Sequence, residues 1–425
     1  MKRSALFCYG LLISFVFSVG AFADEKSKSN YDIYGSTAFQ AGQFVKGVNA
    51  GGPIDHKWTE SFLFELGVDA SVHKRLHVYA SGQMITTFSH RLNLANIDVY
   101  KATQFPMYSF IPTQAHGVIG ILGDFSNPVL QLGIGFIPFK YNPDVHNLGE
   151  FLFRSGTYPA YLLNDFDTPF ARLLGFRLSS RLPIGQKTML KQDLFLSSQA
   201  RMYPFMDWSI SYVAGFSLSS LFELGAGISF SNLFSIDKKI TEPYVGGQNL
   251  LPDSSGNYAF AGTKMMARIS IDPKALFEAT FFGNEDLKLY SELAILGVKD
   301  YPVYYDDIGQ RIPVVFGFNF PAFKILDVLS IELEFWNSRY PNSWNNVYAT
   351  IPRPVIDSLS TLFPHDKIKW SIYAKKEILK GFSIIGQAAS DHIQPISHAI
   401  TMQDRTDVLQ KTSDWWWIGK FQFDF

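Results

Sequence analysis

The chain has one cysteine, a low charge content and, beyond its first residues, no long apolar run. Cys8 lies in the apolar N-terminal stretch, so disulfides and thiol catalysis are excluded for everything that follows it. Charged residues make up 18%, below the ~25% of soluble domains. A helical membrane protein of this size would need several runs of about 20 apolar residues. Acidic and basic counts nearly balance, which leaves no basic excess for binding nucleic acid.

Residues 1–23 have the three parts of a secretory signal peptide. Lys2 and Arg3 supply the positive start, residues 5–19 form an apolar core, and Ala21 and Ala23 flank a small-residue cleavage site. A permanent membrane anchor is the alternative, but the apolar core is short for one. We expect a short polar segment at 24–30 and a single domain at 31–425.

Apolar and polar residues alternate along much of the chain, which is 16% aromatic with a mean hydropathy of only +0.04. The clearest stretches are residues 62–72 and 206–218, where aromatic and aliphatic residues occupy every second position. Successive side chains of a strand point to opposite faces, so each stretch predicts a strand with one apolar face. A soluble sandwich and a membrane barrel both produce this pattern.

Strand length and the last residues favour the membrane barrel. Many alternating stretches run about 11 residues or more, against an average of about 5–6 in soluble proteins. Phe421, Phe423 and Phe425 share one face of the final stretch, and a terminal strand that ends in Phe resembles the C-terminal signal of bacterial outer-membrane barrels. We therefore predict an all-β fold, a single transmembrane antiparallel β-barrel of about 16 strands, within a range of 14 to 18. The expected strands lie near residues 31–46, 57–72, 76–90, 116–126, 129–141, 170–183, 189–202, 206–218, 221–235, 258–272, 287–299, 310–320, 326–340, 366–378, 382–396 and 413–425.

The expected connections alternate between short and long, as they do in bacterial barrels with short periplasmic turns and long external loops. Two connections break this rule: residues 203–205 are short where a long loop is expected, and residues 273–286 are long where a turn is expected. The second begins with Asp272 and Pro273, an N-cap followed by a proline, which predicts a short helix there.

The third external loop, residues 142–169, is the candidate functional segment. It combines aromatic and aliphatic residues with charges, whereas a solvent-exposed loop is mostly polar. We expect it to pack against the inner barrel wall and narrow the pore. The candidate constriction residues are Asp144, His146, Glu150, Arg154, Tyr158, Asp165, Arg177 and Arg181.

Two other interpretations of this loop remain open. Asp144, Glu150 and Arg154 would in one of them only pin the folded loop through internal hydrogen bonds. In the other, the loop would pack outside the barrel or cap it.

Signal peptide, terminal Phe strand, alternation and loop position together resemble the porin class of Gram-negative outer-membrane barrels, with no specific named family. The resemblance implies location in the bacterial outer membrane, contact with its lipids, and insertion by the barrel-assembly machinery. It also implies transport: a channel for passive diffusion of small hydrophilic solutes. Porins of this class are often homotrimers, although the sequence contains no separate interface signal.

Other functions are less well supported. The histidines are scattered, and neither a G-x-S-x-G elbow nor an HExxH zinc motif occurs, so we expect no enzyme activity, no metal site and no cofactor. The few residues between Ala23 and Tyr31 leave no room for the N-terminal plug of a hydrophobic-solute transporter. The remaining alternative is a surface adhesin or structural barrel without an open pore.

Overall fold

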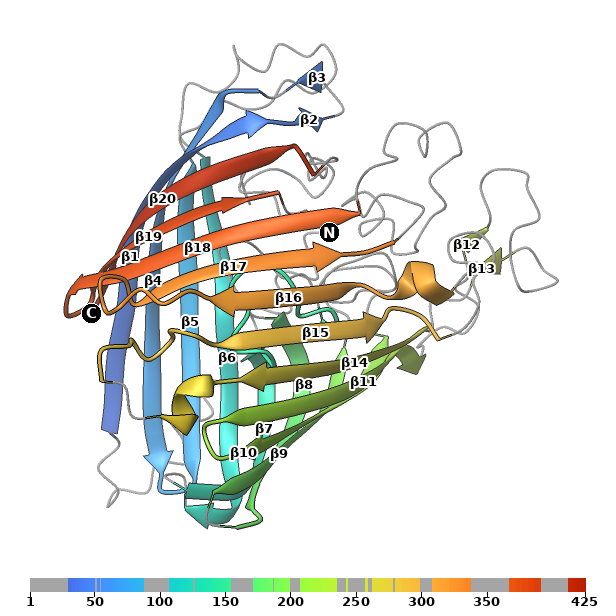
Figure 1. The fold of residues 1–425 in the computed structure, drawn as a ribbon. Coiled ribbons are helices and arrows are strands. Elements are labelled where there is room, and N and C mark those ends of the chain that lie inside the picture. Colours follow the sequence, from blue (N-terminus) through green and yellow to red (C-terminus); the bar gives the residue numbers. More distant parts are fainter. Residues whose placement is uncertain are drawn as a thin grey trace.

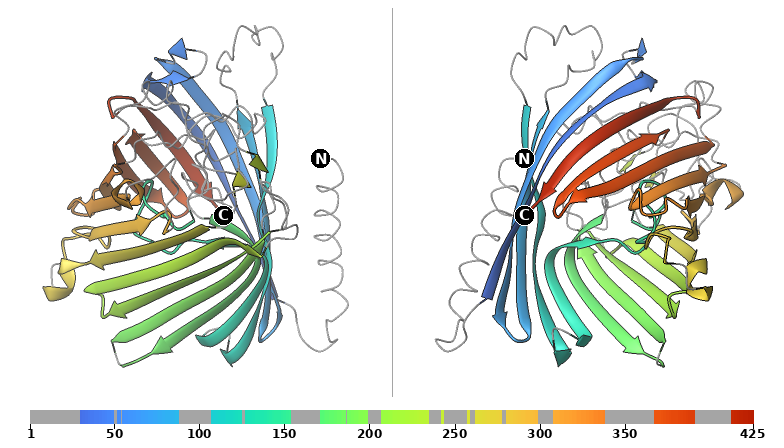
Figure 2. Two further views of the ribbon diagram at one scale, coloured as in Figure 1. Left: turned by 90° about the vertical axis from the view of Figure 1, so that its right-hand side faces the viewer. Right: turned by 60° about the vertical axis from the view of Figure 1, so that its left-hand side comes forward.

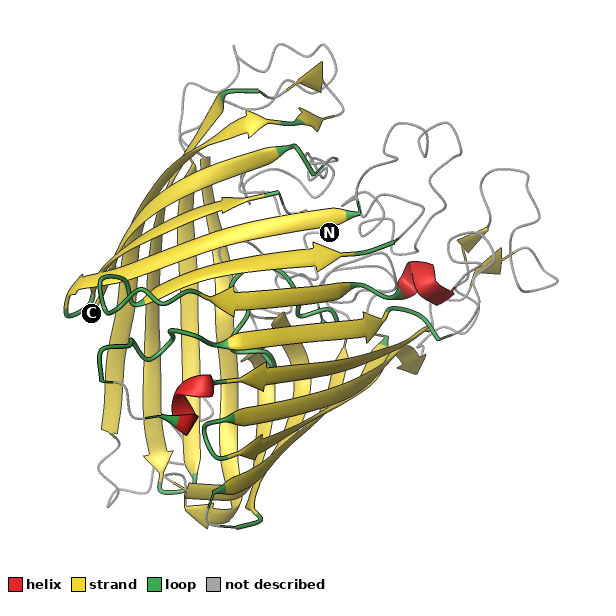
Figure 3. Ribbon diagram, viewed as in Figure 1, coloured by secondary structure: helices red, strands yellow, loops and turns green. Residues whose placement is uncertain are grey.

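The structure is a computed structural model whose described residues form one closed antiparallel β-barrel with two short helical turns (Figures 1 and 3). The described residues are 30–49, 52–53, 55–87, 107–124, 127–153, 171–185, 187–198, 207–234, 242–243, 257–258, 262–277, 280–298, 308–337, 367–390 and 412–425. The predicted signal peptide and segment 24–29 lie outside them, so the predicted division at residue 23 stays a prediction. None of the described helices is long and apolar enough to cross a membrane.

Sixteen strands make the barrel, and each pairs with its neighbours in chain order. They are β1 (Asn30–Lys46), β4 (Lys57–His73), β5 (Leu76–Thr87), β6 (Met107–Asp124), β7 (Asn127–Phe139), β8 (Ala171–Pro183), β9 (Thr188–Ser198), β10 (Trp208–Leu218), β11 (Phe222–Phe234), β14 (Gly262–Ile271), β15 (Leu289–Ile295), β16 (Val314–Asn319), β17 (Val328–Phe335), β18 (Ile368–Leu379), β19 (Phe382–Ala389) and β20 (Trp415–Asp424). The predicted fold class and strand number are confirmed. Two small ribbons, β2 (Val48–Asn49) with β3 (Gly52–Pro53) and β12 (Glu242–Pro243) with β13 (Asn257–Tyr258), lie apart from the barrel.

The ring closes between the first and last strands (Figures 1 and 2). Gly35 and Phe425 exchange two backbone hydrogen bonds of 2.9 Å, and the pairing runs from Ser36 opposite Asp424 to Lys46 opposite Trp415. Every strand therefore has two partners, which removes the unpaired edges that a membrane would not tolerate.

Alternation along the strands divides the barrel wall into an apolar outer face and a polar inner face. Exposed outer residues include Phe39, Leu66, Met84, Phe176, Leu194, Leu224, Leu293, Phe316, Leu333, Phe421 and Phe423. Buried polar residues of the strands include Ser211, Ser229, Lys264, Arg268, Glu292, Glu332, Lys369 and Ser371. Phe421, Phe423 and the terminal Phe425 are all about half exposed on the outside, and their role as an assembly signal stays a prediction.

The barrel has a short-connection end and a long-connection end. The two ends of the chain's barrel portion, Asn30 and Phe425, lie at the short-connection end, where successive strands are joined by turns such as Ser219–Leu221. The predicted helix in the longest connection at this end is confirmed as η2 (Pro273–Leu276), with the Asp272 side chain accepting the backbone N–H of Lys274 at 3.1 Å.

The predicted start of β6 is wrong by nine residues, because the strand begins at Met107 rather than 116. Pro112 interrupts the alternation and suggests a strand end, since proline cannot donate to the sheet. The register shifts between Ser81 and Gly82, so Thr113 forms an extra residue beside Pro112. This bulge accommodates the proline, and Thr113 donates to Glu65 Oε1 at 2.8 Å on the inner wall.

Candidate functional site: a loop folded into the barrel

Residues 140–153 leave β7 and cross the barrel interior to the wall formed by β15 and β17. In the ring, β8, β9, β10, β11 and β14 separate β7 from β15. The backbone of the segment nevertheless donates hydrogen bonds to side chains on both β15 and β17. The described residues 142–153 therefore lie inside the barrel and do not pack outside it, and narrowing of the pore by the loop 142–169 stays a prediction.

The carboxylate of Glu292 on β15 is the first anchor of the loop. Its Oε1 accepts the Tyr141 hydroxyl at 2.5 Å and the Phe151 N–H at 2.9 Å. Its Oε2 accepts the Asn142 side-chain amide at 2.8 Å and the Glu150 N–H at 3.1 Å. Hydrogen bonds to a charged acceptor are about twice as strong as neutral ones, so one side chain holds both ends of the 141–151 turn.

Glu332 on β17 is the second anchor. Its Oε1 accepts the N–H of His146 at 2.5 Å and the Tyr290 hydroxyl at 3.0 Å. Its Oε2 accepts the N–H groups of Asn147 and Leu148 at 3.0 and 2.8 Å. Three consecutive backbone donors thus converge on one buried carboxylate, which satisfies groups that would otherwise be unpaired inside the barrel.

An apolar core fills the space between the loop and the neighbouring walls. The Phe153 ring packs edge-on against Phe139 on β7 at 5.7 Å and against Phe195 on β9 at 6.0 Å. The buried cluster consists of Phe139, Tyr141, Leu148, Phe151, Leu152, Phe153, Ala171, Leu173, Phe195, Val213, Met266, Ala294, Leu296, Val315 and Trp336. Its wall residues come from β7 to β10 and from β14 to β16, so this side of the interior is packed as a protein core.

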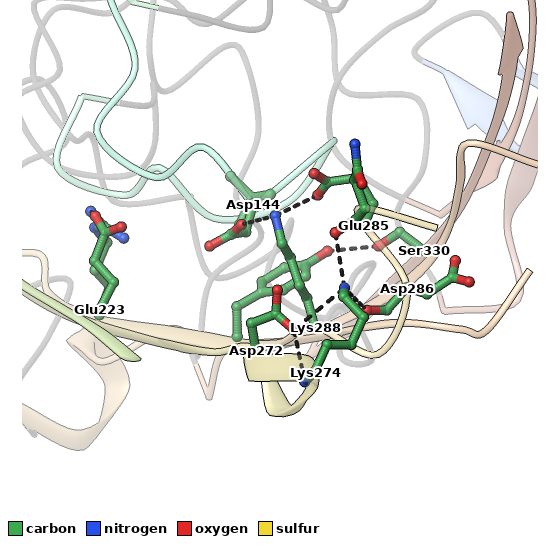
Figure 4. Close-up of polar contacts among 12 residues, drawn as sticks. Asp144, Glu223, Asp272, Lys274, Glu285, Asp286, Lys288 and Ser330 are labelled. Atoms are coloured by element: carbon green, nitrogen blue, oxygen red, sulfur yellow. Dashed lines mark hydrogen bonds and ion pairs between the residues drawn. The ribbon is translucent and has the colours of Figure 1, made fainter. Parts of the chain in front are cut away.

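Asp144 connects the loop to the end of β15 through an ion pair (Figure 4). Its Oδ1 lies 3.7 Å from Lys288 Nζ, which also lies 2.7 Å from Glu285 Oε2. Both acidic side chains approach the same ammonium group, as Figure 4 shows. Asp144 therefore forms an ion pair with the wall, whereas the alternative interpretation expected it only to pin the loop through internal hydrogen bonds.

Burial shifts the pKa of both Glu150 and His146 in the direction that favours the neutral form. Burial, followed by the charge of Glu292, raises the pKa of Glu150 to about 8. Its Oε1 accepts the Asn142 N–H at 2.5 Å, an internal bond of the expected kind. Loss of solvent around its ring, followed by the charge of Lys140, lowers the pKa of His146 to about 3. The His146 ring is stacked at 4.5 Å on Tyr373 of β18.

Of the two predicted wall residues, Arg177 lies beside the loop core. Its guanidinium is 4.9 Å from the centre of the Phe139 ring and donates to Asp193 Oδ1 at 2.8 Å. Arg181 lies four residues further along β8 toward the short-connection end, and its side chain is exposed. Arg154, Tyr158 and Asp165 lie outside the described residues. A constricting role for all of these residues stays a prediction.

The two anchors are the functional residues that sequence reasoning missed. The alternation places Glu292 and Glu332 on the inner face, together with many other charged residues, but nothing local marks them as loop acceptors. Their partners are backbone N–H groups more than a hundred positions away, and backbone donors leave no trace in the sequence.

The inner wall formed by β1, β4, β5 and β6 differs from the packed side. Tyr79 and His116 are stacked at 4.8 Å, and His77 continues the stack at 6.4 Å from Tyr79. Asp69 Oδ1 lies 3.5 Å from His77 Nδ1. This surface presents aromatic faces next to carboxylates and hydroxyls, which suits contact with water and polar solutes.

The described residues contain no group of three or more His, Asp or Glu side chains that could hold a metal ion. Neither a family model nor a curated protein matches the chain.

Among solved structures, the chain is similar to OmpF of Salmonella typhi in complex with daunomycin, with 9% identity over 93% of this chain and 97% of that one and a TM-score of 0.49. It is also similar to a mutant of the Rh. blastica porin, with 8% identity over 93% of this chain and 100% of that one and a TM-score of 0.46. These similarities say nothing of the family or role of this chain, and the closed sixteen-stranded barrel is established by its own strand pairing.

Proposed function

We propose that the chain is an outer-membrane channel for passive diffusion of small hydrophilic solutes, narrowed by residues 142–169. The observation that carries the proposal is the passage of residues 140–153 through the interior to Glu292 and Glu332. A barrel of sixteen strands encloses more space than its own inner side chains fill. A loop fixed across that space reduces the bore without closing it.

The solute path runs between the loop and the wall of β19, β20, β1, β4, β5 and β6. The apolar core occupies the other side, where the walls of β7 to β10 and β14 to β16 meet the loop. Glu65, Asp69, Tyr79 and His116 line the path on the inner wall, and Asp144, His146 and Glu150 belong to the loop that faces it. Arg177 and Asp193 form an ion pair beneath the loop.

Location in the outer membrane follows from the same proposal. The apolar outer face contacts lipid, the short-connection end lies in the periplasm and the long connections lie outside the cell. Phe421, Phe423 and Phe425 form the terminal strand face that the barrel-assembly machinery binds. Assembly as a homotrimer belongs to the same proposal.

Single-channel recording of the purified protein in a planar bilayer tests the channel. Reproducible conductance steps are expected, and deletion of residues 147–161 is expected to enlarge each step because it removes the loop from the bore. Insertion without steps would refute the channel and leave an adhesin or structural barrel. Unchanged steps after the deletion would refute the constriction while leaving the channel in place.

A further inference from the structure

Two connections at the short-connection end carry large apolar side chains in exposed positions. Residues 272–288 join β14 to β15, and residues 320–327 join β16 to β17. The exposed fractions are 72% for Leu276, 57% for Phe281, 51% for Phe323 and 75% for Ile325. Side chains of this size and exposure, gathered in one patch, mark a contact with a membrane or another protein.

Ring contacts join the two connections into one surface, which we call the aromatic platform: Leu276, Phe277, Phe281, Phe282, Phe323 and Ile325. Phe323 is stacked on Phe282 at 5.7 Å and on Phe281 at 6.1 Å. Phe281 and Phe282 are 4.2 Å apart. The platform is therefore an assembled surface and not a set of independent side chains.

Polar contacts beneath the aromatic rings hold the platform in place. Asp286 Oδ2 accepts the N–H of Gly283 at 2.8 Å and that of Phe323 at 3.1 Å, so one carboxylate links both connections. Lys274 Nζ donates to the carbonyls of Asn284, at 2.9 Å, and Asp286 (Figure 4). The backbone beneath the platform is thereby paired, which a segment at a membrane surface requires.

The strands above the platform are among the shortest in the barrel. β15, β16 and β17 have 7, 6 and 8 residues, whereas β1 and β4 have 17 each and β6 has 18. Flanking backbone bonds such as Leu287 to Asn319 and Leu296 to Arg311 extend the pairing slightly. A tilted strand needs about 9–11 residues to cross the hydrocarbon layer, so this sector has no strand residues left for the interfacial layer.

The outer face of these strands continues into the platform. Phe316 is exposed in the middle of β16, and Phe320 is exposed directly after the strand, 4.6 Å from the Phe318 ring. Phe323 and Ile325 follow within the same connection. η2 follows β14 almost directly, and residues 320–327 follow β16 directly, so both parts of the platform belong to the barrel rim of this sector.

We propose that the aromatic platform is inserted into the headgroup and upper acyl layer of the leaflet at the short-connection end. It thus completes the membrane contact of the β15–β17 sector with two connections instead of strands. Aromatic side chains favour this layer, where membrane proteins place their interfacial belts. The exposed side chain of Lys324, between Phe323 and Ile325, adds a cation at phosphate level. The inference rests on the proposed membrane-spanning function.

Single-cysteine labelling tests the platform. Leu276→Cys and Ile325→Cys are made separately in a Cys8→Ser background, and an environment-sensitive fluorophore is attached to the new cysteine. Each purified protein is reconstituted in vesicles of phosphatidylethanolamine and phosphatidylglycerol. Quenching is measured with lipids brominated near the headgroup and with aqueous iodide. Phe316→Cys on the outer strand face is the lipid control, and Lys74→Cys in the exposed β4–β5 turn is the water control.

Brominated lipid is expected to quench both platform labels, and iodide is expected to quench them several-fold less than the label at residue 74. Iodide quenching equal to that at residue 74 would place the platform in water and overturn the inference. Protection from both quenchers would also overturn it, because a second copy of the chain would then cover the surface. Absence of lipid quenching at residue 316 would refute the membrane barrel itself, which separates the failure of the proposed function from that of the platform.

Discussion

Replacing Glu332 with glutamine should release the loop from the barrel wall. The change keeps the shape of the side chain but converts one acceptor oxygen into an NH2 donor. Oε1 of Glu332 accepts hydrogen bonds from the His146 N–H and the Tyr290 hydroxyl. Oε2 accepts hydrogen bonds from the N–H groups of Asn147 and Leu148. With the NH2 group in the Oε2 position, the N–H groups of Asn147 and Leu148 lose their acceptor. In the other orientation only the His146 N–H of the loop loses it, because the Tyr290 hydroxyl can donate to Ser330 Oγ at 2.6 Å.

A buried donor without a partner costs about 1–3 kcal/mol, so the docked loop should lose about 1–3 kcal/mol relative to the undocked one when the amide takes its less costly orientation. At about 1.4 kcal/mol per factor of ten, the lower value already shifts the ratio of docked to undocked loop by roughly 5-fold. The barrel strands themselves are unchanged, because the Glu332 backbone keeps its pairing with Gly317 and Ser371.

Single-channel recording and limited proteolysis measure the effect. Glu332→Gln is expected to give larger or noisier conductance steps and faster cleavage in residues 142–169. Glu223→Gln is the matched control, since Glu223 is also an inner-wall glutamate but forms an ion pair with Arg268 on a neighbouring strand. Conductance and cleavage identical to those of the unmodified protein would show that Glu332 does not hold the loop, and the anchoring argument would be wrong.

Three further outcomes are expected. Gly175→Ala should lower the unfolding temperature, because φ is +150° and an added Cβ would meet the Leu196 carbonyl, whereas Gly386→Ala meets nothing within 4 Å and should not; equal shifts would contradict this. Glu150 has its pKa raised to about 8, so the loop stability that its protonation provides is complete at low pH and is lost as pH rises through 8. Protease protection of the loop should therefore fall as pH rises from about 4.5, the ordinary pKa of the group, to about 8, and Glu150→Gln should flatten that fall; an unchanged slope would refute the assignment. Removal of Phe425 should reduce the amount of heat-modifiable barrel in the outer membrane, and normal amounts would exclude its role as a signal.

The fold could be predicted from the sequence because an antiparallel barrel repeats one local rule. Period-two alternation places all sixteen strands, and the predicted ranges overlap every observed barrel strand. The rule fails where a side chain breaks it locally, as at Pro112, whose bulge depends on a pairing with β5 that the sequence does not display.

The site was accessible only in part. The apolar content of residues 148–153 predicts that the loop packs against something, and the structure buries Leu148, Phe151 and Phe153. The anchors could not be predicted, because Glu292 and Glu332 differ from other inner-face glutamates only in the backbone donors that reach them. Which glutamates accept the N–H groups of the loop depends on the path that the loop takes through the barrel.

The pairing of β1 with β20 also determines the order of events during assembly. The first strand obtains its second partner only when the last strand has taken its place, so a nascent or partly inserted sheet has two free edges throughout. Joining them brings together segments from opposite ends of the chain, which is a slow, high-contact-order step. Until that step the unpaired edges can pair with other chains and aggregate. The two reciprocal hydrogen bonds between Gly35 and Phe425 are part of the β1–β20 pairing that removes both edges.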